Sequence, residues 1–379
     1  MSEIGDRIYQ LRTERAPRLT QRELAERAGV SIDLVQKLEQ HRKATAKITT
    51  LQALANALDV DLAAVVSKPT HLQTLPDDGG GLLELRRALT PVVDDQGEPM
   101  TPADLRAALA EAWAGYWRGD YDLLGAILPG MIASAHGPGT DDALAEACQI
   151  AACTLVHLGH SDLSLLAAQR GLRHVADPLL RAAIVGTHAW ILLNQGRPSD
   201  AAAIAVREAD EMEPRRKAAP AAVSLWGNLL VTAATAAARD GDDSEAQDLL
   251  AVAHGAAARL GEDRNDYQTA FGTSQVAMQR VDVAVVAGDY PRALDAAARM
   301  PRGGSLPLAA HARHRSDVAH AHARLGHAGQ AEAILLEVET AAPRWMRYQV
   351  FPRSIVAELL SQRRPSSALR GLARRLDVR

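Results

Sequence analysis

The sequence predicts an all-α protein that joins a small N-terminal domain to a long helical repeat, and three observations support this prediction. The 379 residues are rich in alanine and only 3% are aromatic, which favours closely packed helices over sheets. Apolar residues near the N-terminus recur at helical spacing. Beyond Thr101, glycines followed by polar turns recur at intervals of 37 to 47 residues, long enough for two antiparallel helices.

Residues 19–60 have the order of elements of a helix-turn-helix. Thr20 is expected to cap a short helix with Glu23 in the capping-box position, Gly29 supplies the turn, and Ser31 caps the next helix. An earlier amphipathic helix is indicated by apolar residues three and four apart, namely Ile4, Ile8 and Leu11. This order is typical of domains that place their second helix in the major groove of DNA.

The helix after the turn is expected to have an inward and an outward face. The inward residues are Ser31, Leu34, Val35 and Leu38. The outward residues, suited to contact base edges, are Ile32, Asp33, Gln36, Lys37 and Gln40. A basic loop follows, suited to phosphate contacts, and contains His41, Arg42, Lys43 and Lys47.

This segment resembles the lambda-repressor/Cro type of helix-turn-helix, also called the xenobiotic-response-element family, which has five helices. The resemblance covers residues 4–66 and is carried by Gln21, Leu24, Ala25, Gly29, Val30, Ser31, Leu38 and Glu39. It implies that Gln21 contacts a DNA phosphate, and that Glu39 pairs with Arg12 to hold the recognition helix. Ile32 and Asp33 stand where the family often has small or amide residues. We therefore expect residues 1–68 to bind double-stranded operator DNA through Gln21, Ser31, Ile32, Asp33, Gln36, Lys37, Gln40, Arg42, Lys43 and Lys47.

Residues 69–101 change in composition, with clusters of Pro, Gly and Asp on either side of one short helix at residues 82–90. Such clusters favour a linker. The remainder, residues 102–379, is predicted to form about six helix pairs and a C-terminal cap. The predicted pairs turn at Gly119, Gly159, Gly196, Gly241, Gly288 and Gly326.

Small residues recur at fixed distances from these glycines, where two helices are expected to cross closely. They are Ala112, Ala152, Ala189, Ala234, Val281 and Ala319 seven residues before, and Ala201, Ala246, Ala293 and Ala331 five residues after the last four glycines. The spacing resembles the tetratricopeptide repeat, with Gly-Asp-Tyr at 119–121 and 288–290 as its best local matches. The periods exceed the roughly 34 residues of that family.

Stacked helix pairs of this kind form a superhelix whose concave wall binds ligands or partner segments. The repeat register places on that wall Trp113, Tyr116, Gln149, His157, Trp190, Asn194, Asn228, Gln275, Met278, Asp282, Arg313, Ser316 and His320. The expected effector site consists of Trp190, Asn194, Asn228, Gln275, Arg313 and His320. Buried polar groups need partners, which favours a ligand, although a hydrated groove explains the same residues.

Charge and motifs restrict the function further. The chain has 42 Lys and Arg residues and 46 Asp and Glu residues. Residues 1–70 contain 11 basic and 9 acidic residues, whereas the rest of the chain contains 31 basic and 37 acidic residues. A basic N-terminal module therefore precedes an acidic body. Neither a disulfide nor a zinc site is expected from Cys148 and Cys153, five residues apart on a helix. His311 and His314 lack a matching acidic or Cys partner, so no metal is expected. We expect no enzyme, no cofactor, no membrane span and a cytoplasmic location.

As a whole, the chain resembles bacterial transcriptional regulators, particularly those of actinobacteria, and residues 271–294 carry that likeness. Its architecture is also similar to that of the Gram-positive peptide-sensing regulators. The resemblance implies a sequence-specific transcription factor that acts as a homodimer, with repeats that sense a peptide or small-molecule effector or mediate dimerisation. The alternative is an adaptor whose repeats bind a partner protein and whose N-terminal domain tethers it to DNA.

Overall fold

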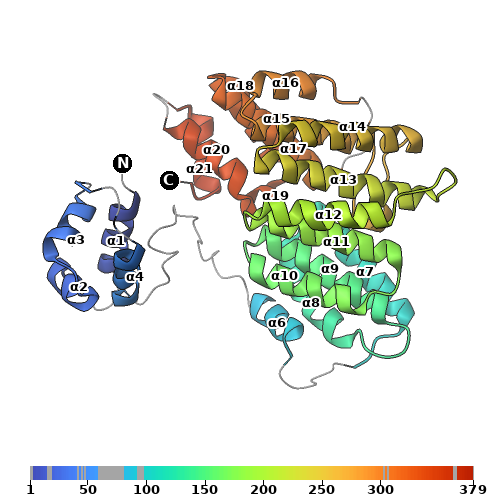
Figure 1. Cartoon of the computed structure of the whole chain (residues 1–379), viewed down its shortest axis with the longest axis horizontal. Coiled ribbons are helices and arrows are strands. Elements are labelled where there is room, and N and C mark those ends of the chain that lie inside the picture. Colours follow the sequence, from blue (N-terminus) through green and yellow to red (C-terminus); the bar gives the residue numbers. More distant parts are fainter. Residues whose placement is uncertain are drawn as a thin grey trace. The chain divides into compact units, whose positions relative to one another are not determined.

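The computed structural model describes residues 3–14, 19–40, 42–43, 46, 48–58, 81–91, 98–301, 304, 307–361 and 365–378. These residues form helices and connecting segments, with no β-strand among them (Figure 1). The chain divides into two compact units, residues 1–77 and 78–379. The prediction of an all-α protein with a small N-terminal domain and a helical repeat is confirmed.

The N-terminal unit contains α1 (Glu3–Glu14), α2 (Gln21–Ala28), α3 (Ile32–Glu39) and α4 (Ile48–Ala57). Its core is built from fully buried apolar side chains of all four helices, including Ile8, Leu24, Val35, Leu38 and Leu54. The expected fifth helix would follow Leu58, outside the described residues.

The predicted caps and turn of this unit are confirmed. Thr20 accepts a hydrogen bond from the Glu23 backbone N–H at 3.2 Å, and the Glu23 carboxylate accepts one from the Thr20 backbone N–H at 2.7 Å. Gly29 adopts a left-handed conformation with φ +63°, which a β-carbon would disfavour. Ser31 accepts from the Leu34 backbone N–H at 3.2 Å. Ser31 is exposed rather than inward, because an N-cap residue precedes the helix and its hydroxyl turns back to the first turn.

The backbones of α1 and α3 touch at Gly5. A β-carbon built on Gly5 would lie 1.9 Å from the carbonyl oxygen of Leu38, far inside van der Waals contact. Only glycine allows this approach. The position of α3 is therefore set directly by the backbone of α1.

The second unit begins with α6 (Gly81–Leu89) and continues with six helix pairs. The pairs are α7 (Pro102–Arg118) with α8 (Tyr121–Ser134), α9 (Asp141–His157) with α10 (Ser161–His174), α11 (Pro178–Asn194) with α12 (Pro198–Glu211), α13 (Pro220–Asp240) with α14 (Asp243–Leu260), α15 (Thr273–Val286) with α16 (Tyr290–Ala298), and α17 (Leu308–Arg324) with α18 (Ala328–Ala341). Successive pairs stack on one another (Figure 1).

The turn glycines predicted from the sequence each lie between the two helices of one pair. All six have φ between +72° and +93°, the left-handed region that favours glycine. The ten small residues predicted at the helix crossings are fully buried. The periodicity of the repeat is therefore confirmed, and its physical basis is a glycine turn combined with close helix packing.

The helix expected within the linker belongs to the repeat domain. Leu85 and Leu89 of α6 are buried in the same core as α7 and α8, and α6 packs mainly against α8. The Arg170 guanidinium of α10 also donates a hydrogen bond to the Ala88 carbonyl at 2.5 Å. The helix therefore covers the first end of the stack.

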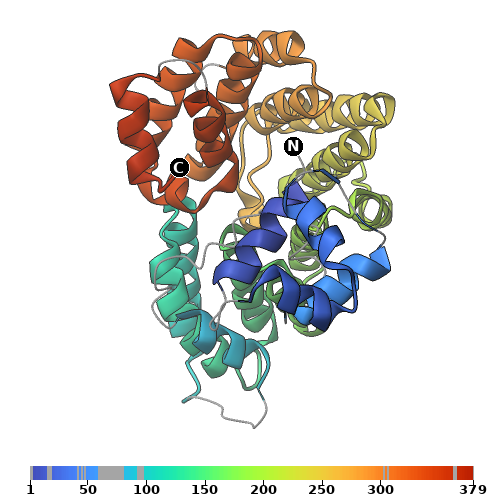
Figure 2. The same ribbon diagram turned by 90° about the vertical axis from the view of Figure 1, so that its left-hand side faces the viewer.

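The last helices return to the first pair. They are α19 (Pro343–Tyr348), α20 (Val350–Leu360) and α21 (Ser367–Arg375). Buried Trp345 lies so close to Gly119 that a β-carbon there would be 2.8 Å from the Trp345 Cβ. Arg344 and Tyr348 donate to Asp120 and Asp122 at the start of α8. Figure 2 shows the C-terminal helices beside the helices that begin the repeat, so the two ends of the stack are in contact.

One helix in the described residues is long and apolar enough to cross a membrane by length and composition alone. It is α13, and 67% of its most apolar window is buried inside the protein. This burial is typical of the central helix of a stacked repeat.

Candidate functional site

The outward face of α3 lies on the surface of the N-terminal unit. Ile32, Asp33, Lys37 and Gln40 are exposed, and Gln36 is half-buried. Arg42 and Lys43 follow α3 and are exposed as well, whereas His41 and Lys47 lie outside the described residues. The side chains expected to contact bases therefore share one accessible face.

Two of these side chains pair with each other. The Lys37 ammonium lies 2.7 Å from a carboxylate oxygen of Asp33, one helical turn earlier, and both groups are exposed. An exposed pair of this kind contributes well under about 1 kcal/mol, so it can be separated at little energetic cost. The two opposite charges offset each other in the middle of the outward face of α3.

A cluster at the end of α3 connects the first three helices of the N-terminal unit. The Arg12 guanidinium donates to both carboxylate oxygens of Glu39 at 2.8 Å and to the Leu19 carbonyl at 2.8 Å. Gln21 donates to Glu39 at 2.7 Å. The predicted Arg12–Glu39 pair is confirmed, and hydrogen bonding to Glu39 raises the pKa of Arg12.

A cavity of about 250 Å³ lies inside the repeat domain. The first helix of every pair contributes to its wall, together with the segment between α14 and α15. Its polar and aromatic lining residues include Tyr116, Trp117, Gln149, Thr187, Trp190, Asn228, Thr235, Arg239, Gln268, Thr269, Gln275, Gln279, Asp282, Arg313 and Asp317. The wall is therefore polar and charged with an aromatic part.

Four of the six residues expected to form the effector site line this cavity: Trp190, Asn228, Gln275 and Arg313. Asn194 does not, because its amide is exposed and donates to the Trp190 carbonyl at 2.8 Å. His320 does not either, because its ring packs between those of Tyr290 and Phe351, with centroids 5.7 and 5.4 Å away.

The wider set of concave-wall residues divides in the same way. Tyr116, Gln149, Met278 and Asp282 line the cavity, whereas Trp113, His157 and Ser316 do not. The indole N–H of Trp113 donates to Glu146 at 2.8 Å. His157 packs against Tyr116, Tyr121 and Trp190 at the joint with the C-terminal cap, and burial lowers its pKa to about 4. It is therefore neutral at pH 7.

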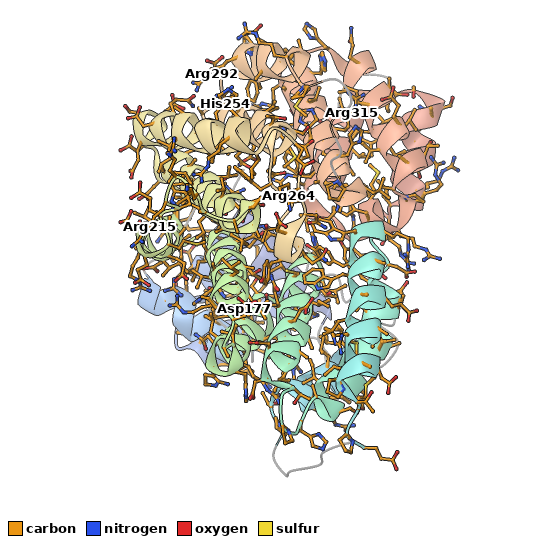
Figure 3. All side chains as sticks on the ribbon, turned by 90° about the vertical axis from the view of Figure 1, so that its right-hand side faces the viewer. Asp177, Arg215, His254, Arg264, Arg292 and Arg315 are labelled. Carbon is orange, nitrogen blue, oxygen red and sulfur yellow. The ribbon has the colours of Figure 1, made fainter. Side chains whose placement is uncertain are left out.

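The segment between α14 and α15 crosses the inner side of the repeat. Tyr267 donates to Asp177 at 2.7 Å, Gln268 accepts from the Trp117 indole at 2.7 Å, and the Thr269 carbonyl accepts from Asn228 at 2.9 Å. Figure 3 shows labelled Arg264 of this segment near the middle of the view, with Arg292, His254 and Arg215 toward the rim. Tyr267, Gln268 and Ala270 have positive φ, a strained conformation that these contacts maintain.

A cluster of charged and polar groups from α13, α15 and α17 forms another part of the cavity wall. Arg313 of α17 lies 3.2 Å from a carboxylate oxygen of Asp282 and 3.5 Å from one of Asp317. Gln279 donates to Asp282 at 2.8 Å and to Thr235 at 2.5 Å. Burial raises the pKa of Asp317 to about 7, against the opposing effect of Arg313. Asp317 therefore changes its charge near neutral pH.

Asp317 is expected to make the repeat domain less stable as the pH rises. Its pKa in the folded protein lies above its value in the unfolded chain, so the folded state retains the proton and stability falls as the pH rises through about 7. The amide in the variant Asp317→Asn cannot titrate. Urea unfolding of the wild type and of this variant at pH 5, 6, 7 and 8 should show the wild type losing free energy of unfolding relative to the variant. A difference that is constant with pH would contradict this.

Several residues that line the cavity were not predicted from the sequence. Thr232, Thr235 and Arg239 lie four, seven and eleven residues beyond Asn228 on α13, on the same helical face, and Asp317 lies four beyond Arg313. These residues could have been predicted by following the inward faces of α13 and α17 at the helical period of 3.6 residues. Gln268 and Thr269 belong to an irregular segment, and no periodic signal marks them.

Comparisons with known proteins support the N-terminal assignment. Residues 8–65 match the helix-turn-helix family. A protein of Bacillus subtilis (strain 168), described as the uncharacterized HTH-type transcriptional regulator RghRB, is 32% identical over 78 residues, which cover 21% of this chain and 55% of that protein. The chain thus spans about half the length of this relative.

A solved structure aligns with most of the chain. It is Bacillus thuringiensis PlcR in complex with the peptide PapR7 and DNA, with a TM-score of 0.42, 12% identity, and coverage of 84% of this chain and 99% of that chain. The tetratricopeptide and actinobacterial resemblances stay predictions. The family match and the geometry of α2 and α3 together make the N-terminal unit a helix-turn-helix domain.

Proposed function

We propose that this protein is a sequence-specific DNA-binding transcriptional regulator that reads DNA through α3. The observation that carries the proposal is the exposed face of α3, in a unit that matches the helix-turn-helix family and is held in place by Arg12 and Glu39. Gln36 and Lys37 offer donors to base edges, and Asp33 accepts from cytosine. The proposed phosphate contacts are Gln21, Ser31, Arg42, Lys43 and Lys47, with Ile32 and Gln40 beside the bases.

We further propose that two copies act together as a homodimer. Two helix-turn-helix units would then read half-sites about 10–10.5 base pairs apart, or a multiple of that spacing. The repeat domain would bind a peptide or small-molecule effector in its cavity. Because all six pairs contribute to the cavity wall, a ligand there would change the curvature of the stack. This change would alter the distance between the two helix-turn-helix units of the dimer.

The size of the cavity suits a compact ligand rather than a folded partner protein. About 250 Å³ lies just below the range of roughly 300–1,000 Å³ that is usual for small-molecule sites. A folded partner protein would have to bind elsewhere, on the outer surface of the stack. Co-purification separates the two functions, because a sensor retains a small ligand and an adaptor retains a stoichiometric protein.

Removing the two donors of α3 is expected to weaken operator binding. The double variant Gln36→Ala, Lys37→Ala should bind DNA fragments selected in vitro with the wild type at least about tenfold more weakly, since each good base contact contributes roughly 1–3 kcal/mol. A gel-shift titration measures this. The control is Lys217→Ala, which removes an exposed lysine from the loop between α12 and α13. Equal affinity of the double variant and the control would show that α3 is not the recognition helix.

A further inference from the structure

One guanidinium in the cavity has no partner. Arg239, near the end of α13, lines the cavity and makes no hydrogen bond or ion pair with the residues that the structure describes. Its cationic neighbour Arg313 is engaged by Asp282 and Asp317. Both nearby carboxylates are therefore already paired, and Arg239 is the cation left over.

The environment of Arg239 favours the approach of an anion. Burial lowers the pKa of Arg239, and the nearby Arg313 acts in the same direction, whereas the charges of Asp282 and Asp317 offset only part of this effect. An anion in the cavity would restore the lost interaction. The planar guanidinium matches a carboxylate, which it can hold with two parallel hydrogen bonds.

Two carbonyl oxygens in the same wall also lack partners. Gln149 is 2% exposed, and its Oε1 accepts no hydrogen bond within the described residues. The Oε1 of Gln275, which lines the cavity as well, is buried and equally unpaired there. A buried acceptor without a donor is unfavourable by about 1–3 kcal/mol. These oxygens require N–H or O–H groups from whatever occupies the cavity.

The remaining features restrict the size and charge of the occupant. The cavity of about 250 Å³ is suited to a compact molecule, and Trp190 and Tyr116 offer an apolar part of the wall. Asp282 and Asp317 lie close enough to interact electrostatically with Arg239. The negative charge of Asp282, joined by that of Asp317 once it is ionised, disfavours a doubly charged anion such as phosphate more than a single carboxylate.

We propose that the cavity binds a compact monocarboxylate that pairs with Arg239 and donates N–H or O–H hydrogen bonds to Gln149 and Gln275. The assignment rests on the proposed role of the cavity as an effector site, and it specifies the chemistry of the effector. An N-acylated amino acid is the simplest molecule with the core of this chemistry, because it combines one carboxylate for Arg239 with one amide N–H, which can donate to one of the two oxygens.

Matched acids and amides test the assignment with the full-length protein. The probes are N-acetylglycine, N-acetylalanine and N-acetylvaline, each compared with its primary amide, which has the same shape and no charge. Binding is followed by tryptophan fluorescence, since Trp117 and Trp190 line the cavity. The wild type should bind the acids at least about tenfold more tightly than the amides, as expected for a charged hydrogen-bonded pair.

Variants locate the preference within the cavity. Arg239→Gln should abolish the preference for acids without changing amide binding, and Arg239→Lys should retain part of it because the charge remains. The control is Arg299→Gln, an exposed arginine of the α16 C-terminus that pairs with Asp295 outside the cavity. Circular dichroism verifies that each variant is folded. Gln149→Met should weaken both acids and amides.

Three results would overturn the assignment. They are acids that bind no better than amides, a preference that survives in Arg239→Gln, and inorganic phosphate binding more tightly than every acid. If the amides bind as well as the acids, the cavity is still an effector site, but its ligand is not an anion. The DNA-binding function is judged separately by the α3 variants, so failure of one proposal is distinguishable from failure of the other.

Discussion

Glu39→Ala is expected to destabilise the N-terminal domain by about 3–5 kcal/mol, because it leaves a buried arginine without its anion. The Glu39 side chain is only 3% exposed and accepts hydrogen bonds from Arg12 of α1 and Gln21 of α2. Its loss therefore removes the polar connections of α3 to both neighbouring helices and leaves only their apolar packing. DNA binding should disappear together with the stability, since the recognition helix loses its fixed position.

Hydrogen exchange on the full chain measures this effect within the N-terminal unit. The amides of α1 to α3 should lose protection in Glu39→Ala. The matched control is Glu26→Ala, which removes an exposed glutamate from α2. Protection in Glu39→Ala equal to that in the control would mean that the Arg12–Glu39–Gln21 cluster does not hold the domain together.

Gly227→Ala is expected to destabilise the repeat domain by at least about 1–3 kcal/mol through overpacking. A β-carbon on Gly227 of α13 would lie 2.0 Å from the Phe271 ring. Phe271 is buried and exchanges two backbone hydrogen bonds of 2.8 Å with Arg264, so the ring cannot move without the segment between α14 and α15. That segment carries Gln268 and Thr269 into the cavity wall. Effector binding should therefore weaken as well.

Urea unfolding followed by tryptophan fluorescence measures the loss. Gly255→Ala is the matched control, because Gly255 lies on the exposed side of α14 and a β-carbon there meets nothing within 4 Å. That control should be stabilised by up to about 1 kcal/mol, since alanine favours helix over glycine. If Gly227→Ala unfolds at the same urea concentration as Gly255→Ala, Phe271 does not fix the segment against α13.

The sequence was most informative where the controlling interactions are local. Thr20, Glu23 and Gly29 form their cap and turn within a few residues, so their pattern in the sequence determines their geometry. The repeat glycines act in the same way. Gly5 gave no such signal, because the constraint on it comes from Leu38, which is 33 residues away in the sequence.

The candidate cavity was predicted only in part. Helical register placed Trp190, Asn228 and Arg313 on the inner wall, because the first helices of the pairs do face inward. Register alone could not show that the stack closes. Closure depends on contacts such as Trp117 with Gln268 and Tyr348 with Asp122, which are 151 and 226 residues apart and follow no period.

The most direct test of the central claim, that α3 reads specific DNA sequences, is genome-wide mapping of the sites that the protein occupies in its cell. The wild type should occupy discrete sites that share a motif, with half-sites separated by about 10–10.5 base pairs or a multiple. The Gln36→Ala, Lys37→Ala variant, expressed at the same level, should lose those sites. Wild-type occupancy without a shared motif, or an unchanged set of sites in the variant, would contradict the account.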